Sequence, residues 1–478
     1  MKKPSFPKKE NTGRIALRGG GYSLAVTAVV LAICVAVNVL AGLLPTSATR
    51  YDISAAKLYS VTSSTKAVLS GLTDDVTIYW IVQAGQEDSV IENLLGKYES
   101  LSDHITVEVK NPDVYPTFAA QYTDETVANN SLVVACGDRS RYIAYDDIYQ
   151  QEVDYATYSA SYSFDGEGQI SSAIDYVTRE ELPQVYRLTG HGEADLSEAF
   201  SGQLTRDNIE VTDFSLLTEN GVPEDADCVL IYAPESDIAE EEVTLLADYV
   251  SGGGKLLVLA GPTQDGTLTN LYSLLESRGV TAVDGIVVES DSQYYTFGYP
   301  YILMPDMASS DVTDSLITEG YNAVMPISQG LTVSDSVSNV TTLLTTSDTA
   351  FSKAAGYAMT TVDKEDGDTD GPFALAVEIT DGSGEMIWFA SSLLVEDAYN
   401  SMSSGGNLDL VMNALSALIG EQESLSIRSK SLSYNYLTIS ESQASTIKMV
   451  MIGIIPLAFA AAGVYAVVKR RSKRHEQN

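Results

Sequence analysis

Residues 228–260 read CVLIYAPESDIAEEEVTLLADYVSGGGKLLVLA, in which two continuous apolar runs enclose a segment with helical spacing. Apolar runs such as 228–233 and 255–260 are typical of strands that are buried on both faces of a sheet. The glycines at 252–254 supply a helix end and a turn. This strand–helix–strand order predicts an α/β fold with a parallel sheet covered by helices.

The same pattern continues on both sides and defines a larger α/β domain at 182–422. Asp237 and Glu240 are expected to form a capping box for the helix that ends near Val250. The other elements expected in this domain are strands at 185–189, 340–344, 373–379 and 386–389, and helices at 196–205 and 407–419. An extended segment, 423–446, is expected to follow the domain.

A smaller α/β domain is expected at 51–149, because its periodicity changes in the order strand, helix, strand, hairpin. This order is thioredoxin-like. The expected elements are strands at 76–82 and 105–110, a helix at 89–101 and a hairpin formed by 131–136 and 141–144. Residues 150–181 are expected to contain an irregular loop up to 168 and a linking helix at 169–179.

Charge is distributed very unevenly along the 478 residues, whose net charge is −37. Twelve of the 28 Lys and Arg residues border two apolar runs near the ends, so 16 remain in the middle. Only Glu10 and Glu476 of the 65 acidic residues lie outside the middle, which leaves 63 there and a net charge of −47. A body this acidic repels phosphate groups, which excludes nucleic acid as a partner.

The two apolar runs are predicted to be transmembrane helices that contact the lipid bilayer. Residues 22–44 carry no charge, and 449–468 form the second run. At ~1.5 Å per residue, each covers a ~30 Å hydrocarbon core. The basic residues of 1–21 and 469–478 place both ends in the cytoplasm by the positive-inside rule. We therefore expect a two-pass protein of the cell membrane with an extracytoplasmic body.

Alternatives to these spans are a cleaved signal peptide for the first run and a buried core helix for the second. Small residues at four-residue spacing predict that another helix packs closely on each span. These helix-packing candidates are Ala28, Ala32 and Ala36 in the first run and Ala458, Ala462 and Ala466 in the second.

Motifs for catalysis and for cofactor binding are missing from the sequence. Gly252–Lys255 is followed by leucine and is not a Walker A motif. No G-x-S-x-G elbow is present. The three cysteines, Cys34, Cys136 and Cys228, form no C-x-x-C pair, and the sequence leaves open whether Cys136 and Cys228 form a disulfide. We expect no catalytic residue and no cofactor.

One histidine is a candidate for ligand binding. Gly190, His191, Gly192 and Glu193 follow the strand expected at 185–189. Open α/β sheets bind ligands at the carboxyl ends of their strands, so this turn is a candidate site. The alternative is that His191 only shapes the turn.

A weak calcium candidate lies at Asp366, Asp368 and Asp370, which copy the start of a calcium loop. The twelfth position of that loop requires a carboxylate but holds Val377. We therefore predict a solvated hairpin loop and no metal site.

Several stretches are considered together: 52–61 (DISAAKLYSV), 169–179 with 183–188 and 190–193, and 426–430 (SIRSK) followed by 454–456 and a basic end. In this order they resemble the auxiliary components of gliding-motility-type (GldG-like) ABC transporters. The resemblance implies a permease subunit and a separate cytoplasmic ATPase as partners. It also implies an amidotransferase-like (flavodoxin-like) fold for the larger domain. The catalytic cysteine of true amidotransferases is missing, so that activity is not expected.

The sequence therefore predicts a non-enzymatic extracytoplasmic auxiliary subunit of an ABC-type transport system. It would couple a permease and an ATPase to the binding of substrate or cell-envelope material. Two alternatives stay open at this point. One is a membrane-anchored hydrolase or transferase that uses His191 and Glu193, and the other is a surface adhesion or sensing module.

Overall fold

The computed structural model describes residues 28–33, 35, 60–154, 159–219, 221–420, 427, 430–432 and 463. The chain divides into two compact units. One comprises 1–151 with 163–430, and the other comprises 152–162 with 431–478. Both sheets described next belong to the first unit.

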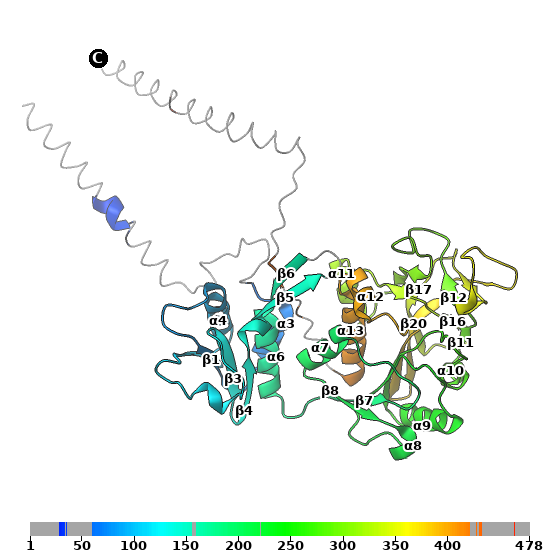
Figure 1. Ribbon diagram of the computed structural model, residues 1–478, viewed down its shortest axis with the longest axis horizontal. Coiled ribbons are helices and arrows are strands. Elements are labelled where there is room, and N and C mark those ends of the chain that lie inside the picture. Colours follow the sequence, from blue (N-terminus) through cyan, green and yellow to red (C-terminus); the bar gives the residue numbers. More distant parts are fainter. Residues whose placement is uncertain are drawn as a thin grey trace, which may run out of the picture. The chain divides into compact units, whose positions relative to one another are not determined.

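The small sheet has the strand order β2-β1-β3-β4. Figure 1 labels three of these strands, β1, β3 and β4. β1 is parallel to β2, and β3 is antiparallel to both β1 and β4. Helix α4 buries Ile91, Leu94, Leu95 and Tyr98, the apolar side that the periodicity predicts. The bounds are β1 Val76–Ile81, β2 Ile105–Lys110, β3 Ser131–Cys136, β4 Arg139–Ile143, α3 Ser63–Gly71, α4 Ser89–Leu101, η1 Ala119–Gln121, α5 Tyr145–Ile148 and α6 Gly166–Thr178.

The segment expected to be a loop up to residue 168 is instead largely strand. β5 spans Tyr149–Asp154 and β6 spans Ser159–Phe164, and both belong to a three-stranded sheet with β22, Lys430–Ser431. The loop prediction was wrong because these strands are rich in Ser, Gln and Tyr. Apolar and polar residues therefore do not alternate clearly along them, and the period of two is not visible in the sequence.

The large sheet has the order β11-β16-β20-β21-β10-β9-β7-β8. The five strands from β21 to β8 are parallel, and in chain order they are arranged 2-1-3-4-5. β20, β16 and β11 extend the sheet by antiparallel pairing. The bounds of the parallel strands are β7 Gln184–Leu188, β8 Glu210–Phe214, β9 Cys228–Tyr232, β10 Lys255–Leu259 and β21 Gly384–Phe389.

β17 pairs with β20 and with β14, which completes the large sheet, while β12-β18-β19 and β13-β15 form two small sheets of their own. The bounds of the remaining strands of this region are β11 Val280–Val283, β12 Ile286–Val288, β13 Ile302–Leu303, β14 Asp306–Met307, β15 Met325–Pro326, β16 Gly330–Val333, β17 Val340–Thr345, β18 Phe351–Lys353, β19 Thr369–Asp370 and β20 Ala374–Asp381.

Helices cover both faces of the parallel strands (Figure 1). Alternate residues of β9 and β10 face two separate cores: Leu230 and Leu257 in one, Ile231 and Val258 in the other. Side chains of α7, α11 and α13 complete the first core, and those of α8, α9 and α10 complete the second. The helix bounds are α7 Glu198–Arg206, α8 Leu216–Glu219, α9 Glu240–Ser251, α10 Thr269–Glu276, α11 Asp314–Glu319, η2 Gly356–Ala358, α12 Asp397–Met402 and α13 Gly406–Ile419.

The predicted capping box of α9 was wrong. Asp237 caps the next helix instead, because its carboxylate accepts hydrogen bonds from the backbone N–H groups of Asn270 (2.7 Å) and Leu271 (3.0 Å). At the start of α9, Glu242 accepts from the N–H of Ala239 at 2.9 Å.

The prediction of two transmembrane helices needs correction. Within the described part of the chain, no helix has the length and apolar character that a bilayer crossing requires. The longest described helix, α13, has 14 residues. At ~1.5 Å per residue it covers only about 21 Å of a ~30 Å core.

The predicted spans themselves lie almost entirely outside the described residues. Ala28 and Ala32 fall in a short described helical stretch and are exposed. The other helix-packing candidates, Ala36, Ala458, Ala462 and Ala466, lie outside the described residues.

Candidate functional site

The candidate site lies at the carboxyl edge of the parallel strands, where the strand order reverses. β7 lies between β8 and β9, so the segment after β7 and the segment after β9 leave the sheet next to each other. In folds with this strand order, ligands bind in the crevice outside such a point. Here the two segments are 189–197 and 233–239.

His191 stands in the first segment and is 7% exposed. Its Nδ1 lies 2.9 Å from Oε1 of Glu193, and its Nε2 lies 3.0 Å from Oε2 of Glu242 on α9. Both carboxylates are buried, with side chains that are 4% and 1% exposed. The imidazole therefore bridges the end of β7 to the first turn of α9.

Backbone contacts fix this turn further. The carbonyl of His191 accepts from the N–H groups of Glu235 (3.1 Å) and Ser236 (2.9 Å). Oε2 of Glu193 accepts from the N–H groups of Gly190 (3.0 Å) and His191 (2.7 Å). Gly192 has φ +75, and a side chain there would meet Glu235 at 3.3 Å. Glycine is thus the residue that this close approach permits.

Two carboxylates around one imidazole set its protonation. The hydrogen bond with Glu193 raises the pKa of His191, and the bond with Glu242 adds to this against the opposing effect of burial. Burial raises the pKa of Glu193, but the hydrogen bonds from His191 and the backbone outweigh it and lower the pKa overall. Because both ring nitrogens are in hydrogen bonds to buried carboxylates, neither is free to act as a general base.

The turn thus unites His191 with Glu193, as the sequence suggests, and adds Glu242. Sequence reasoning missed Glu242 because it is the third of three consecutive glutamates, 51 positions away, and nothing local distinguishes it. The geometry favours a role in positioning the turn. Ligand binding by Gly190, His191, Gly192 and Glu193 stays a prediction.

The end of β9 offers no reactive group. Ala233 follows this strand in the left-handed region, with φ +50, and only a methyl group projects from its backbone. Cys228, at the start of the same strand, is a buried free thiol, and burial raises its pKa to about 12. Cys136 is also a free thiol, so the two cysteines do not pair.

The weak calcium candidate encloses a lysine of the chain itself. The ammonium of Lys353 is fully buried and lies 2.6 Å from Glu365 and 3.1 Å from Asp368. It also donates to the carbonyl of Asp363 at 2.8 Å. Asp370 pairs with Lys364 instead. No cluster of metal-ligating side chains occurs among the residues that the structure describes.

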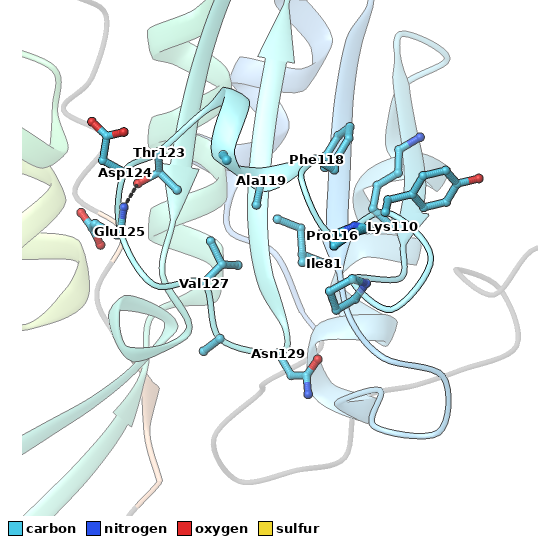
Figure 2. Close-up of a pocket in the computed structure, with 14 residues that line it drawn as sticks. Ile81, Lys110, Pro116, Phe118, Ala119, Thr123, Asp124, Glu125, Val127 and Asn129 are labelled. Carbon is cyan, nitrogen blue, oxygen red and sulfur yellow. Dashed lines mark hydrogen bonds between the residues drawn. The ribbon is translucent and has the colours of Figure 1, made fainter.

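A cavity of about 380 Å³ lies in the small-sheet region (Figure 2). Ile81 and Lys110, the last residues of β1 and β2, contribute to its lining. The ammonium of Lys110 lies 5.2 Å from the ring centre of Phe118 and pairs with Glu108 at 2.7 Å. The volume falls within the range of small-molecule pockets. No sequence motif indicated this cavity.

Comparison with known protein families finds a match for the larger domain. Residues 182–414 match the family described as "ABC-type uncharacterized transport system". This region is therefore similar to a transport-associated family. The match agrees with the GldG-like auxiliary component resemblance of the sequence, and we call 182–414 the transport-family domain. Residues 55–149 match a domain of unknown function (DUF7088). No curated protein matches the chain in sequence.

Several solved structures resemble about half of this chain at low sequence identity. The mmIFT52 N-terminal domain is 15% identical, with 49% of this chain and 97% of that chain covered and a TM-score of 0.38. A cytoplasmic protein from Salmonella typhimurium is also 15% identical, with coverages of 49% and 98% and a TM-score of 0.32. A glutamine amidotransferase from Thermotoga maritima is 7% identical, with coverages of 50% and 99% and a TM-score of 0.31.

Proposed function

We propose that this chain is a non-enzymatic auxiliary subunit of an ABC-type transport system. In this role it binds a permease subunit that is driven by a separate cytoplasmic ATPase, and it couples them to the binding of substrate or envelope material. The observation that carries the proposal is the family match over the transport-family domain. The location of the acidic body outside the cytoplasm is part of the proposal.

The chemistry of the carboxyl edge supports a binding role over a catalytic one. His191 has both ring nitrogens engaged by buried carboxylates. Ala233 presents a methyl group where the strand β9 ends, and the Cys228 thiol is buried. These side chains maintain the shape of the edge, and none of them is an activated nucleophile.

Affinity capture tests this proposal. The full chain, tagged and produced at its natural level, is isolated from its own cells in mild detergent, and the captured proteins are identified by mass spectrometry. We expect a permease and an ATPase of one transport system in fixed ratio to the chain. A tagged, unrelated acidic protein serves as the control. Isolation of the chain without any transport component would contradict the proposal.

A further inference from the structure

An aromatic hairpin, residues 289–304, follows β12 and includes β13 in its second arm. Five aromatic residues lie within it: Tyr294, Tyr295, Phe297, Tyr299 and Tyr301. Its two arms pair through the N–H of Met304 and the carbonyl of Tyr294 at 2.7 Å. The N–H of Thr296 and the carbonyl of Ile302 pair in the same way at 3.0 Å. The hairpin is therefore a regular element with a defined tip.

The tip is a tight turn that holds an unexpected residue. The N–H of Tyr299 donates to the carbonyl of Thr296 at 3.1 Å, and the two residues between them have positive φ, +55 for Phe297 and +76 for Gly298. These are the features of a type I′ turn, whose first central position favours Asn or Gly. A bulky aromatic residue at positive φ is strained by roughly 1–2 kcal/mol.

Phe297 gains no burial in return for this strain. Its side chain is 63% exposed, and the neighbouring Tyr299 is 50% exposed. The rings of Tyr299 and Tyr301 lie 5.7 Å apart, so the exposed aromatic surface continues from the tip along one arm. Strain at an exposed aromatic residue does not serve folding, and such outliers are concentrated at functional sites.

The base of the hairpin is firmly held. Glu289 is 2% exposed, and its carboxylate accepts hydrogen bonds from the hydroxyl groups of Ser347 (2.9 Å) and Thr349 (2.6 Å). The same carboxylate accepts from the N–H of Ser290 at 2.9 Å. A fixed base means that the aromatic tip is presented in one orientation, which lowers the entropic cost of binding a partner.

The stretch of sequence that carries the hairpin is acidic, and this restricts what that partner can be. Between Arg278 and Lys353 the sequence contains no Lys or Arg, but it contains nine acidic residues: Asp284, Glu289, Asp291, Asp306, Asp311, Asp314, Glu319, Asp335 and Asp348. An anionic lipid surface would be repelled by this segment. A protein surface with basic residues around an apolar pocket is complementary to it.

We infer that the aromatic hairpin is a docking element whose tip, Phe297 with Tyr299, inserts into an apolar pocket of a partner protein rimmed by Lys or Arg. This rests on the proposed function, because the partner is a component of the transport system. Rigid aromatic residues supply much of the binding energy in such interfaces.

A single substitution separates the two effects of Phe297. Phe297→Asn places a favoured residue in the turn, so the thermal unfolding midpoint of the full chain should rise by about 2 °C. Capture of the transport component should fall about tenfold or more, because the anchor is lost. Leu217→Asn is the control: Leu217 is 60% exposed on α8, and its loss should leave the capture unchanged.

A photocrosslinker identifies the occupant. With p-benzoylphenylalanine at position 297, irradiation of intact cells should join the chain to a transport component, at a segment containing both apolar and basic residues. The same probe at position 217 should give no such product. A product with a second copy of this chain, with lipid only, or with nothing would overturn the inference.

The two proposals fail in distinguishable ways. If the unmodified chain captures the transport component and Phe297→Asn captures it equally well, the docking inference falls and the proposed function stands. If the unmodified chain captures no transport component, the proposed function falls, and the docking inference falls with it.

Discussion

At the scale of single residues, the imidazole of His191 joins two segments that are far apart in the sequence. One of its partners, Glu193, belongs to the same turn at the carboxyl edge of the sheet. The carboxylate that completes the bridge, Glu242, comes from another element, so only the tertiary fold brings it to the imidazole. In the loop of the weak calcium candidate, the ammonium of Lys353 likewise pairs with Glu365 and Asp368 from another part of the chain.

The His191 bridge predicts a specific pH dependence. The pKa of His191 is raised in the folded chain, so its stabilisation is complete below the unfolded pKa of ~6.5 and is lost as pH rises through the folded pKa. The pKa of Glu193 is lowered, so its stabilisation is present above ~4.3 and is lost as pH falls through the folded pKa. Maximal stabilisation is expected between about pH 4.5 and 6.5.

His191→Gln should therefore lower the free energy of unfolding by about 3 kcal/mol near pH 6, since it leaves two buried carboxylates without their cation. The difference from the unmodified chain should shrink towards pH 9. Thermal unfolding followed by circular dichroism over this pH range measures it. His104→Gln is the matched control, because His104 pairs with Asp75 at the surface and should show little change. A difference that is constant from pH 6 to pH 9 would refute the bridge.

The Lys353 loop predicts indifference to calcium. Since the ammonium occupies the centre of the acidic loop, millimolar Ca²⁺ or a chelator should not move the thermal unfolding midpoint. Lys353→Met should lower it, because the buried Asp368 loses its counter-ion. A calcium-dependent rise in the midpoint of the unmodified chain would show that the loop is a metal site after all.

At the scale of elements, sequence periodicity predicted helices and strands correctly where apolar and polar residues are clearly separated along the pattern. The helix at 89–101 and the strands around 228–232 and 255–259 lie where the pattern predicts them. In the polar strands β5 and β6, apolar and polar residues do not alternate clearly, so the period of two is hard to recognise. The helix that Asp237 caps, α10, could not be predicted either, because it is brought to Asp237 by the tertiary fold. The short antiparallel strands β11 and β16 were missed, since pairing with neighbours stabilises them.

The first turn of α6 contacts segments that are distant in the sequence. These contacts could not be predicted from the local sequence. Glu167, which is 2% exposed, accepts from the ammonium of Lys430 at 2.8 Å and from the hydroxyl of Thr65 at 2.7 Å. Lys430 also donates to the carbonyl of Ser60 at 2.6 Å. Ser60 and Lys430 belong to two stretches that carry the family resemblance, 52–61 and 426–430, and Glu167 lies two residues before the third, 169–179.

Lys430→Met should break this contact and leave the carboxylate of Glu167 buried without a cation, at a cost of about 3 kcal/mol. Hydrogen exchange measured by mass spectrometry should then speed up in the first turn of α6. Adding Glu167→Leu to Lys430→Met should recover part of the loss, because the unpaired carboxylate is removed. Lys364→Met, at an exposed ion pair, is the control. Unchanged exchange in Lys430→Met would contradict a structural role for the contact.

At the scale of the whole molecule, the structure has the α/β fold with a parallel sheet that the sequence predicts. The predicted transmembrane helices are corrected, because no described helix has the length and apolar character needed to cross a bilayer. The family match ties residues 182–414 to ABC-type transport. The strained aromatic tip and the strongly acidic composition suit the proposed recognition of other proteins. Such binding should weaken as ionic strength increases, because salt screens the charge complementarity.

The central claim is that the chain works as one subunit of a transport assembly, and native mass spectrometry of the material captured from its own cells tests it most directly. The account predicts a complex whose mass exceeds the 51.3 kDa of this chain by the masses of a permease and an ATPase. A spectrum that contains only the 51.3 kDa chain or its multiples would contradict it.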